Sequence, residues 1–481
     1  MNLSEKILLL LIYCSIAPSA ASAVSDDLLS SARAFHDFVR SEELHVDNCA
    51  AAINGIYADL LSKPGDSYDL PAVRQNVAAI TSLTWEIRLA LRHRLKGFFQ
   101  AGNLDRLCAE AIKTALRASR SVEEYLVLNF LDVEPVAPLS GSLPHLQAAE
   151  SFRGPRDLQS GDVLLSRGNA YTSAAIARMG DNDTQFSHLS LVYVDETGET
   201  YTIESWIEVG LFVRKYKEGH YGDGHARVLV YRYEDSSLAH RAAKYMYDLV
   251  RQTEQDPENI PYDFRMDVND SSALFCAEVI SQGFKNASHG EVSVPYLTTQ
   301  FPLSGGDFRD EIGIAFAGGF APADIEADPR FDLIAEWKDY TKLYESHLKD
   351  AVLTKSFAWM EDPDLAYRFD YSWYEAGFTE LLVRARRWSW LSAVTGLNKR
   401  LTKTMQPSAI NVFWALDRTM EPIFLYLKSA DAIFRKSKSR SMIARELYEE
   451  LDELRLQDYS RYVDRSPGII FHDSFRPGKH L

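Results

Sequence analysis

The stretch SHLSLVYVDETGETYTIESW, residues 187–206, decides the fold class that we expect. Its two halves are rich in β-branched and aromatic residues that partly alternate with polar ones, and DETGET separates them as a turn signal. Similar short segments lie on either side, GDVLLSRG (161–168) and ARVLVYRYE (226–234), and the helical stretch SSLAHRAAKYMYDLVRQ (236–252) follows. Strands and helices in this arrangement predict an α+β domain with a small antiparallel β-sheet.

Helical sequence flanks this block on both sides. Segments between residues 25 and 131 carry apolar residues at three- and four-residue spacing, which predicts a four-helix bundle. Residues 132–146, DVEPVAPLSGSLPHL, are rich in Pro, Gly and Ser and are typical of a linker. From about residue 325 the sequence is again helical and rich in aromatic residues. A chain of 481 residues is too long for one ordinary core, so we expect a helical bundle domain at 24–135, the α+β domain at 155–300 and a C-terminal helical domain at 325–481.

The first 23 residues have the parts of a secretory signal peptide. Lys6 is followed by the apolar run Ile7–Ile12 and then by small residues that end in Ala21-Ser22-Ala23, an A-x-A cleavage signal. An uncleaved anchor helix and a lipoprotein attached through Cys14 are the alternatives, and the bulky Tyr13 argues against the lipoprotein. We expect a signal peptide at 1–23 and a periplasmic or secreted protein, with a bacterial source presumed.

Export changes how the four cysteines are interpreted. Cys14 leaves with the signal peptide, and the odd number that remains indicates a free thiol or intermolecular pairing. Cys49 and Cys108 both lie in the N-terminal helical region. We predict that these two form a disulfide, which would add about 4 kcal/mol of stability. Cys276 then remains as the free thiol.

The stretch SSALFCAEVISQGF, residues 271–284, places Cys276 in the first turn of an expected helix. We expect the helix to begin near Asp270–Ser272, where polar side chains can cap it. The positive end of the helix dipole favours a thiolate over a thiol, so Cys276 is a candidate nucleophile. The alternative is packing, since free cysteines behave as small buried hydrophobes.

A nucleophilic thiol needs a base and a group that orients the base. His188 opens the strand SHLSLVYV, and Glu204 lies on the strand after the turn DETGET. A two-residue turn would place Glu204 opposite Leu191, on the wrong face of the sheet. A bulge or a three-residue turn would place it opposite Val192, on the face of His188. The alternatives are a structural histidine and a solvated carboxylate.

The order of these motifs resembles the circularly permuted papain-like cysteine hydrolases, the YiiX/YebB branch of the NlpC superfamily. The resemblance covers residues 155–300 and rests on the motifs Gly161-Asp162, Ser187-His188, Ile203-Glu204, Tyr262-Asp263-Phe264 and Phe275-Cys276-Ala277-Glu278. It implies a permuted papain-like, NlpC-type domain in which His188, Glu204 and Cys276 form the catalytic set. Family members often carry Ser after the cysteine, and Ala277 departs from that pattern. The two helical regions lie outside the resemblance.

Three further sequence features bear on binding. Tyr262 is a candidate to line the site, with core packing as the alternative. The glycine-rich loop EGHYGDGH, residues 218–225, holds two histidines, but no CxxC or HExxH motif accompanies them, so we expect no metal and no cofactor. The basic segment 381–403 carries Trp388 and Trp390, which suits either peripheral contact with a membrane or a packed helix with a solvated face.

The expected function is an exported cysteine hydrolase that cleaves an amide or ester bond through a thioester acyl-enzyme. Its substrate would be a peptide, a cell-wall muropeptide or a lipid, and the resemblance also extends to the lecithin:retinol acyltransferase branch. The net charge of −16 argues against nucleic acid as a partner. The alternatives are an acyltransferase and a non-catalytic module that binds lipid or peptide in the same cleft.

Overall fold

A computed structural model describes residues 28–62, 70–129, 146–180, 184–207, 210–216, 224–253, 260–268, 270–300, 318–367 and 407–477. The expected signal peptide, most of the linker, His220 and the segment with Trp388 and Trp390 lie outside the described residues. The described chain combines helices with an antiparallel sheet, so the α+β class is confirmed.

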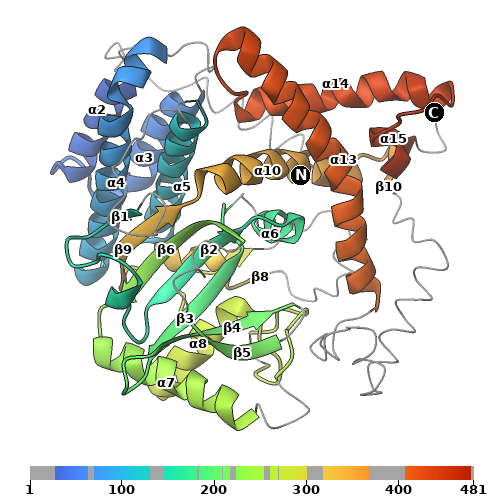
Figure 1. Cartoon of the computed structure of the whole chain (residues 1–481). Helices are drawn as coiled ribbons and strands as arrows, with labels where there is room; N and C mark the ends of the chain where they lie inside the picture. Colours follow the sequence, from blue (N-terminus) through green and yellow to red (C-terminus); the bar gives the residue numbers. More distant parts are fainter. Residues whose placement is uncertain are drawn as a thin grey trace.

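Seven strands form the main sheet in the order β1-β9-β6-β2-β3-β4-β5 (Figure 1). Every neighbouring pair is antiparallel. The strands are β1 (Leu146–Ala148), β2 (Val163–Gly168), β3 (His188–Val194), β4 (Thr200–Trp206), β5 (Gly210–Lys215), β6 (His225–Tyr233) and β9 (Phe331–Lys338). The sequence patterns of β2, β3, β4 and β6 had predicted strands at these positions.

The helical prediction is wrong for residues 331–338, which form β9. This strand pairs with β6 along its length and with β1 on its other side. Its residues FDLIAEWK alternate only in part, because Glu336 and Lys338 are buried together with their apolar neighbours. The sheet therefore extends beyond residues 155–300, the limits that we expected for the α+β domain.

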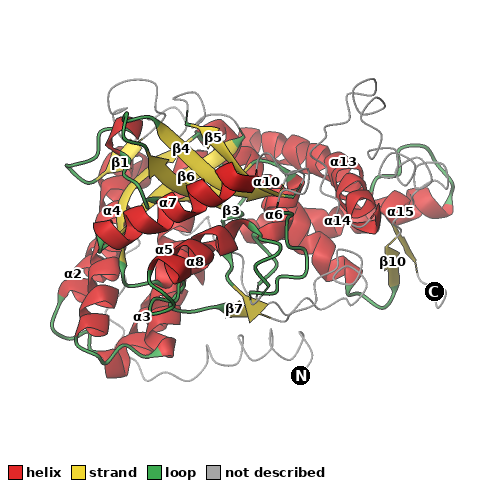
Figure 2. Cartoon of the chain, turned by 90° about the horizontal axis from the view of Figure 1, so that it is seen from below, coloured by secondary structure: helices red, strands yellow, loops and turns green. Residues whose placement is uncertain are grey.

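Two helices cover one face of the sheet. Helices α7 (Ser236–Thr253) and α8 (Cys276–Ala287) pack against each other and against β3 and β4 (Figure 2). Alternate strand residues point toward them and form the largest hydrophobic core, among them Val163, Leu165, Leu189, Leu191 and Ile203. The opposite face carries a second core with Leu164, Val192, Val228, Val230 and Trp337. This packing fixes α8, and with it Cys276, against the strands that carry His188 and Glu204.

Four helices pack together in the described part of the chain before the sheet. The helices are α2 (Leu28–Arg40), α3 (Val46–Ser62), α4 (Leu70–Gln100) and α5 (Arg106–Asn129). Their apolar faces meet in a separate core, and the predicted disulfide between Cys49 and Cys108 joins α3 to α5 inside it. The disulfide prediction is therefore confirmed, and Cys276 is a free cysteine.

Buried charges hold the bundle against the sheet. Arg88 of α4 forms an ion pair with Glu336 of β9 at 2.5 Å, and Arg227 of β6 forms a second ion pair with the same carboxylate at 2.9 Å. Lys338 of β9 pairs with Glu123 of α5. Burial alone would raise the pKa of Glu336, but the surrounding cations hold it well below its ordinary value. Buried charges of this kind are stable only when all partners are present, so the bundle and the sheet form one structural unit.

The C-terminal part forms a further helical layer around α10 (Tyr340–Met360). Helix α10 follows β9 directly and contacts α5 of the bundle, β6 of the sheet and helices α13 and α14 (Figure 1). The other elements of this layer are α13 (Pro407–Lys438), α14 (Ala444–Val463), α15 (Phe471–Ser474) and the strand pair β10 (Leu365–Tyr367) and β11 (Phe475–Pro477). Elsewhere in the described chain are α6 (Tyr171–Ile176), the strand pair β7 (Thr299–Gln300) and β8 (Gly318–Gly319), and the 3₁₀ helices η2 (Pro155–Asp157) and η4 (Pro322–Ala327). None of the helices within the described ranges is both long and apolar enough to cross a bilayer.

Candidate active site

Helix α8 begins at Cys276, later than we expected. The carboxylate of Asp270 accepts hydrogen bonds from the N–H and hydroxyl of Ser272, so it closes a separate turn instead of capping the helix. Leu274 N–H then donates to the carbonyl of Pro261 at 2.9 Å, which keeps the chain extended up to Phe275. The start near Asp270–Ser272 is therefore a wrong prediction. Its correction brings Cys276 closer to the positive end of the helix.

Glu278 stabilises the start of this helix. Its side chain accepts a hydrogen bond from the N–H of Phe275 at 3.0 Å, and Phe275 is the residue that precedes the first helical position. The bond satisfies one of the backbone donors that a helix start leaves unpaired. Cys276 is thereby held in a fixed turn, with 4% of its surface exposed.

The turn between β3 and β4 has the length that we required. Asp195 N–H donates to the carbonyl of Glu199 at 3.0 Å, and the three residues between them include Gly198 with a φ of 82°. Val192 pairs with Thr202, however, and the next positions of the register bring Glu204 alongside Ser190. The predicted partner of Glu204 is wrong by two residues. The predicted face is right, because a shift of two residues keeps a side chain on the same side of the sheet.

His188 interacts with both Glu204 and Cys276. Its Nε2 is 2.9 Å from Oε2 of Glu204, and Cys276 lies close enough to the imidazole to raise its pKa. Burial lowers the pKa of His188, but the interactions with Cys276 and Glu204 outweigh burial and raise it to about 10.

Glu204 is a buried, ionised carboxylate. It is 1% exposed and accepts four hydrogen bonds. Besides His188, the donors are Thr202 Oγ1 at 2.6 Å, Trp206 Nε1 at 2.9 Å and Arg214 Nε at 2.8 Å. Burial would raise the pKa of Glu204, but His188, Arg214 and Thr202 hold it well below its ordinary value. The carboxylate therefore fixes the imidazole and balances its charge.

Two members of this network, Trp206 and Arg214, were missed in the sequence. The guanidinium of Arg214 lies over the ring of Trp206 at 4.8 Å while it bonds Glu204. Arg214 pairs with Thr202 across the sheet, so it shares the face of Glu204. The signal was the segment GLFVRK, which forms β5 and which we had not identified as a strand.

The remaining candidates have structural surroundings. Tyr262 is buried in the main core, with its ring against Phe264 at 4.9 Å. Asp162 accepts two hydrogen bonds from Arg232 at 2.8 Å and is a structural carboxylate between β2 and β6. His225 begins β6. Across the parts of the chain that the structure describes, no group of three or more His, Cys, Asp or Glu could hold a metal ion.

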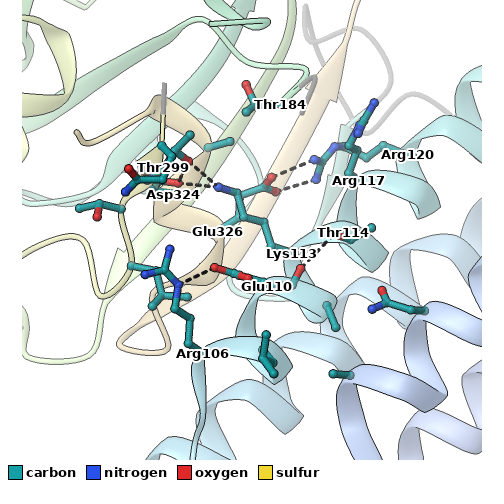
Figure 3. Close-up of a pocket in the computed structure, with 18 residues that line it drawn as sticks. Arg106, Glu110, Lys113, Thr114, Arg117, Arg120, Thr184, Thr299, Asp324 and Glu326 are labelled. Atoms are coloured by element: carbon teal, nitrogen blue, oxygen red, sulfur yellow. Dashed lines mark hydrogen bonds and ion pairs between the residues drawn. The ribbon is translucent and has the colours of Figure 1, made fainter. Parts of the chain in front are cut away.

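A cavity of about 330 Å³ lies away from these residues, between the bundle and η4 (Figure 3). Helix α5 lines it with Lys113 and Arg120, which are bound to the buried carboxylates of Asp324 at 2.5 Å and Glu326 at 2.6 Å. Residues 297–300 form the opposite wall. Because its cations already have intramolecular partners, this cavity belongs to the junction between bundle and sheet. None of Cys276, His188 and Glu204 lines it.

Comparison of the chain with protein-family models, with curated proteins and with solved structures found no match. The chemistry of the site is therefore inferred from its own geometry.

Proposed function

We propose that the chain is a cysteine hydrolase that cleaves an amide or ester bond through a thioester acyl-enzyme. The observation that carries the proposal is the position of His188, whose imidazole hydrogen-bonds Glu204 and lies close enough to Cys276 for the two side chains to interact. The three residues come from α8, β3 and β4, which are separate in sequence. A nucleophile, a base and a group that orients the base form the arrangement that nucleophilic catalysis requires.

The first half of the reaction forms the acyl-enzyme. The thiolate of Cys276 attacks the carbonyl carbon, an S–C bond forms, and the C=O electron pair moves to oxygen. The N–H groups of Cys276 and Ala277 come before the first hydrogen bond of α8, which Glu278 N–H donates to the carbonyl of Phe275, and they can stabilise this oxyanion. The imidazolium of His188 donates its proton to the leaving amine or alkoxide as the C–N or C–O bond breaks.

The second half releases the acyl group. The neutral imidazole of His188 accepts a proton from water while the water oxygen attacks the thioester carbonyl. The C–S bond then breaks, the carboxylic acid leaves, and Cys276 returns as the thiolate beside the protonated imidazole. Glu204 stabilises that imidazolium in both halves.

We also propose a fold family, a compartment and a substrate class for the chain. The permuted papain-like fold of the YiiX/YebB type, export to the periplasm and a peptide, muropeptide or lipid substrate follow from the resemblance and from the N-terminal signal. The antiparallel sheet with the cysteine helix packed on it supports such a fold. An acyltransferase would use the same acyl-enzyme with an acceptor other than water.

The test is the rate at which iodoacetamide alkylates Cys276 as a function of pH. We expect fast alkylation that persists below the free-thiol pKa of about 8.5 and is lost in His188→Ala. The variant His240→Ala is the matched control, because His240 is an exposed histidine on α7. Mass spectrometry of the intact protein with an activated ester should then show an acyl adduct that is absent in Cys276→Ala.

One observation favours a second candidate, a module that binds lipid or peptide without catalysis. Cys276 is 4% exposed, as a packing cysteine would be. Slow alkylation that does not depend on His188 would support this candidate and contradict the hydrolase.

A further inference from the structure

Two buried glutamates with opposite surroundings lie next to the Cys276–His188 pair. Glu204 and Glu278 are each 1% exposed. Glu204 accepts four hydrogen bonds, two of them from cationic side chains. Glu278 accepts one, from the N–H of Phe275, and its second oxygen, Oε1, has no hydrogen-bond partner in the described part of the chain. Buried carboxylates are stable as anions only when such partners surround them.

The charges that act on Glu278 oppose its ionisation. They come from Asp263 and Asp267 in the loop that precedes α8 and from Cys276 on the same helix. Asp263 is itself buried and uses its oxygens for the N–H groups of Arg265 and Asp267 at 2.8 and 2.7 Å. Burial, followed by these three negative groups, raises the pKa of Glu278 to about 9 against the one backbone bond that lowers it.

We propose that Glu278 is an uncharged positioning residue, which keeps its proton in the folded protein and fixes the turn that presents Cys276. The retained proton follows from the surroundings of Glu278 alone. Its benefit for the thiolate rests on the proposed function.

The physical reason is that two acidic side chains lie at the same end of helix α8. An anion near the first turn is stabilised by the helix dipole, and Cys276 and Glu278 both occupy that turn. A second negative charge there would destabilise the thiolate, whereas a neutral carboxyl keeps the hydrogen bond to Phe275 without that repulsion. The site then contains one ionised glutamate, which stabilises the imidazolium, and one neutral glutamate, which leaves the thiolate undisturbed.

The first experiment measures the retained proton by urea unfolding of wild type and Glu278→Gln between pH 5 and 9. An unfolded glutamate releases its proton near its ordinary pKa of 4.5, whereas the folded protein holds it until about 9. The wild type must therefore lose stability relative to the glutamine variant as pH rises through this range. We expect the gap between the two urea midpoints to widen steadily in favour of Glu278→Gln. A constant gap, as expected for the exposed control Glu150→Gln, would overturn the proposal.

The second experiment measures positioning through alkylation of Cys276. We expect Glu278→Ala, which loses the bond to Phe275, to react at least about fivefold more slowly than wild type. Glu278→Gln should restore the wild-type rate. If Glu278→Gln instead moves the acidic edge of the alkylation profile to lower pH, Glu278 carries a charge and the proposal is wrong. If Glu278→Ala does not fold, the comparison of Glu278→Gln with wild type still decides. If wild-type Cys276 lacks activated alkylation, the hydrolase proposal fails while the urea experiment still tests the proton.

Discussion

Replacing Glu204 by glutamine should lower the pKa of His188. The substitution keeps the size of the side chain and removes the negative charge 2.9 Å from Nε2. The rise in the pKa of His188 from 6.5 to about 10 is equivalent to roughly 5 kcal/mol in favour of the imidazolium. Glu204 and Cys276 share this effect, so we expect the pKa of His188 to fall by roughly 2 units in Glu204→Gln.

The assay is an NMR titration of the His188 ring in wild type and in Glu204→Gln. We expect a midpoint near 10 in wild type and about 8 in the variant, with alkylation of Cys276 slowed between pH 8 and 10, where only the variant has lost its imidazolium. Glu199→Gln is the matched control, because Glu199 lies on the same hairpin and its ion pair with Lys215 is exposed. A midpoint that moves by less than about half a unit in Glu204→Gln would refute the electrostatic role of Glu204.

The same pair makes the stability of the protein depend on pH with a definite sign. The pKa of His188 is raised, so its contribution is complete below 6.5 and is lost as pH rises toward 10. The pKa of Glu204 is lowered, so its contribution is complete above 4.5 and is lost at lower pH. The free energy of unfolding of wild type should therefore exceed that of His188→Ala most between pH 4.5 and 6.5. Denaturant unfolding across this range measures the difference, and an excess that grows toward pH 10 would contradict it.

Three other substitutions test the network and the fold. Arg214→Met keeps the packing on the neighbouring tryptophan but removes a hydrogen bond to the buried carboxylate, so alkylation of the free thiol should slow about tenfold; an unchanged rate would show that the arginine is dispensable. Glu336→Gln leaves buried cations unpaired between bundle and sheet, and its free energy of unfolding in urea should fall by about 3–5 kcal/mol; a loss below about 1 kcal/mol would argue against the cluster. Gly161→Ala would place a Cβ 2.4 Å from Cβ of Ala239 at a φ of 93°, so thermal unfolding should show a loss of more than about 2 kcal/mol; a stable variant would contradict the packing of α7 on β2.

The part of the fold that was predictable has a clear local signal. The strands around His188 and Glu204 combine alternation with turn residues, and the bundle helices have regular apolar spacing. The strand β9 was missed because FDLIAEWK carries charged residues at buried positions and leads directly into a helix. Those charges are compatible with burial only because Arg88 and Arg227, both distant in sequence, neutralise Glu336. No pattern within the strand itself contains that information.

Some residues of the candidate site were also predictable from the sequence, and others were not. Cys276, His188 and Glu204 were predictable because their residue types, their order and the turn between the two strands restrict the geometry. The start of α8 was not, since a second turn uses the carboxylate of Asp270. Arg214 was missed because its role depends on the register of a strand that has little apolar alternation.

The late position of β9 in the chain has a consequence for how the protein is made. During synthesis the bundle and strands β2 to β6 leave the ribosome first, and β6 then has an unpaired edge until residues 331–338 follow. Open strand edges are templates for aggregation, and pairing between distant segments is slow. A nascent chain that stops near residue 300 would contain every member of the Cys276 site and still lack the strand that closes its sheet. Its yield of soluble protein should therefore depend on continuing through β9 rather than on completing the site.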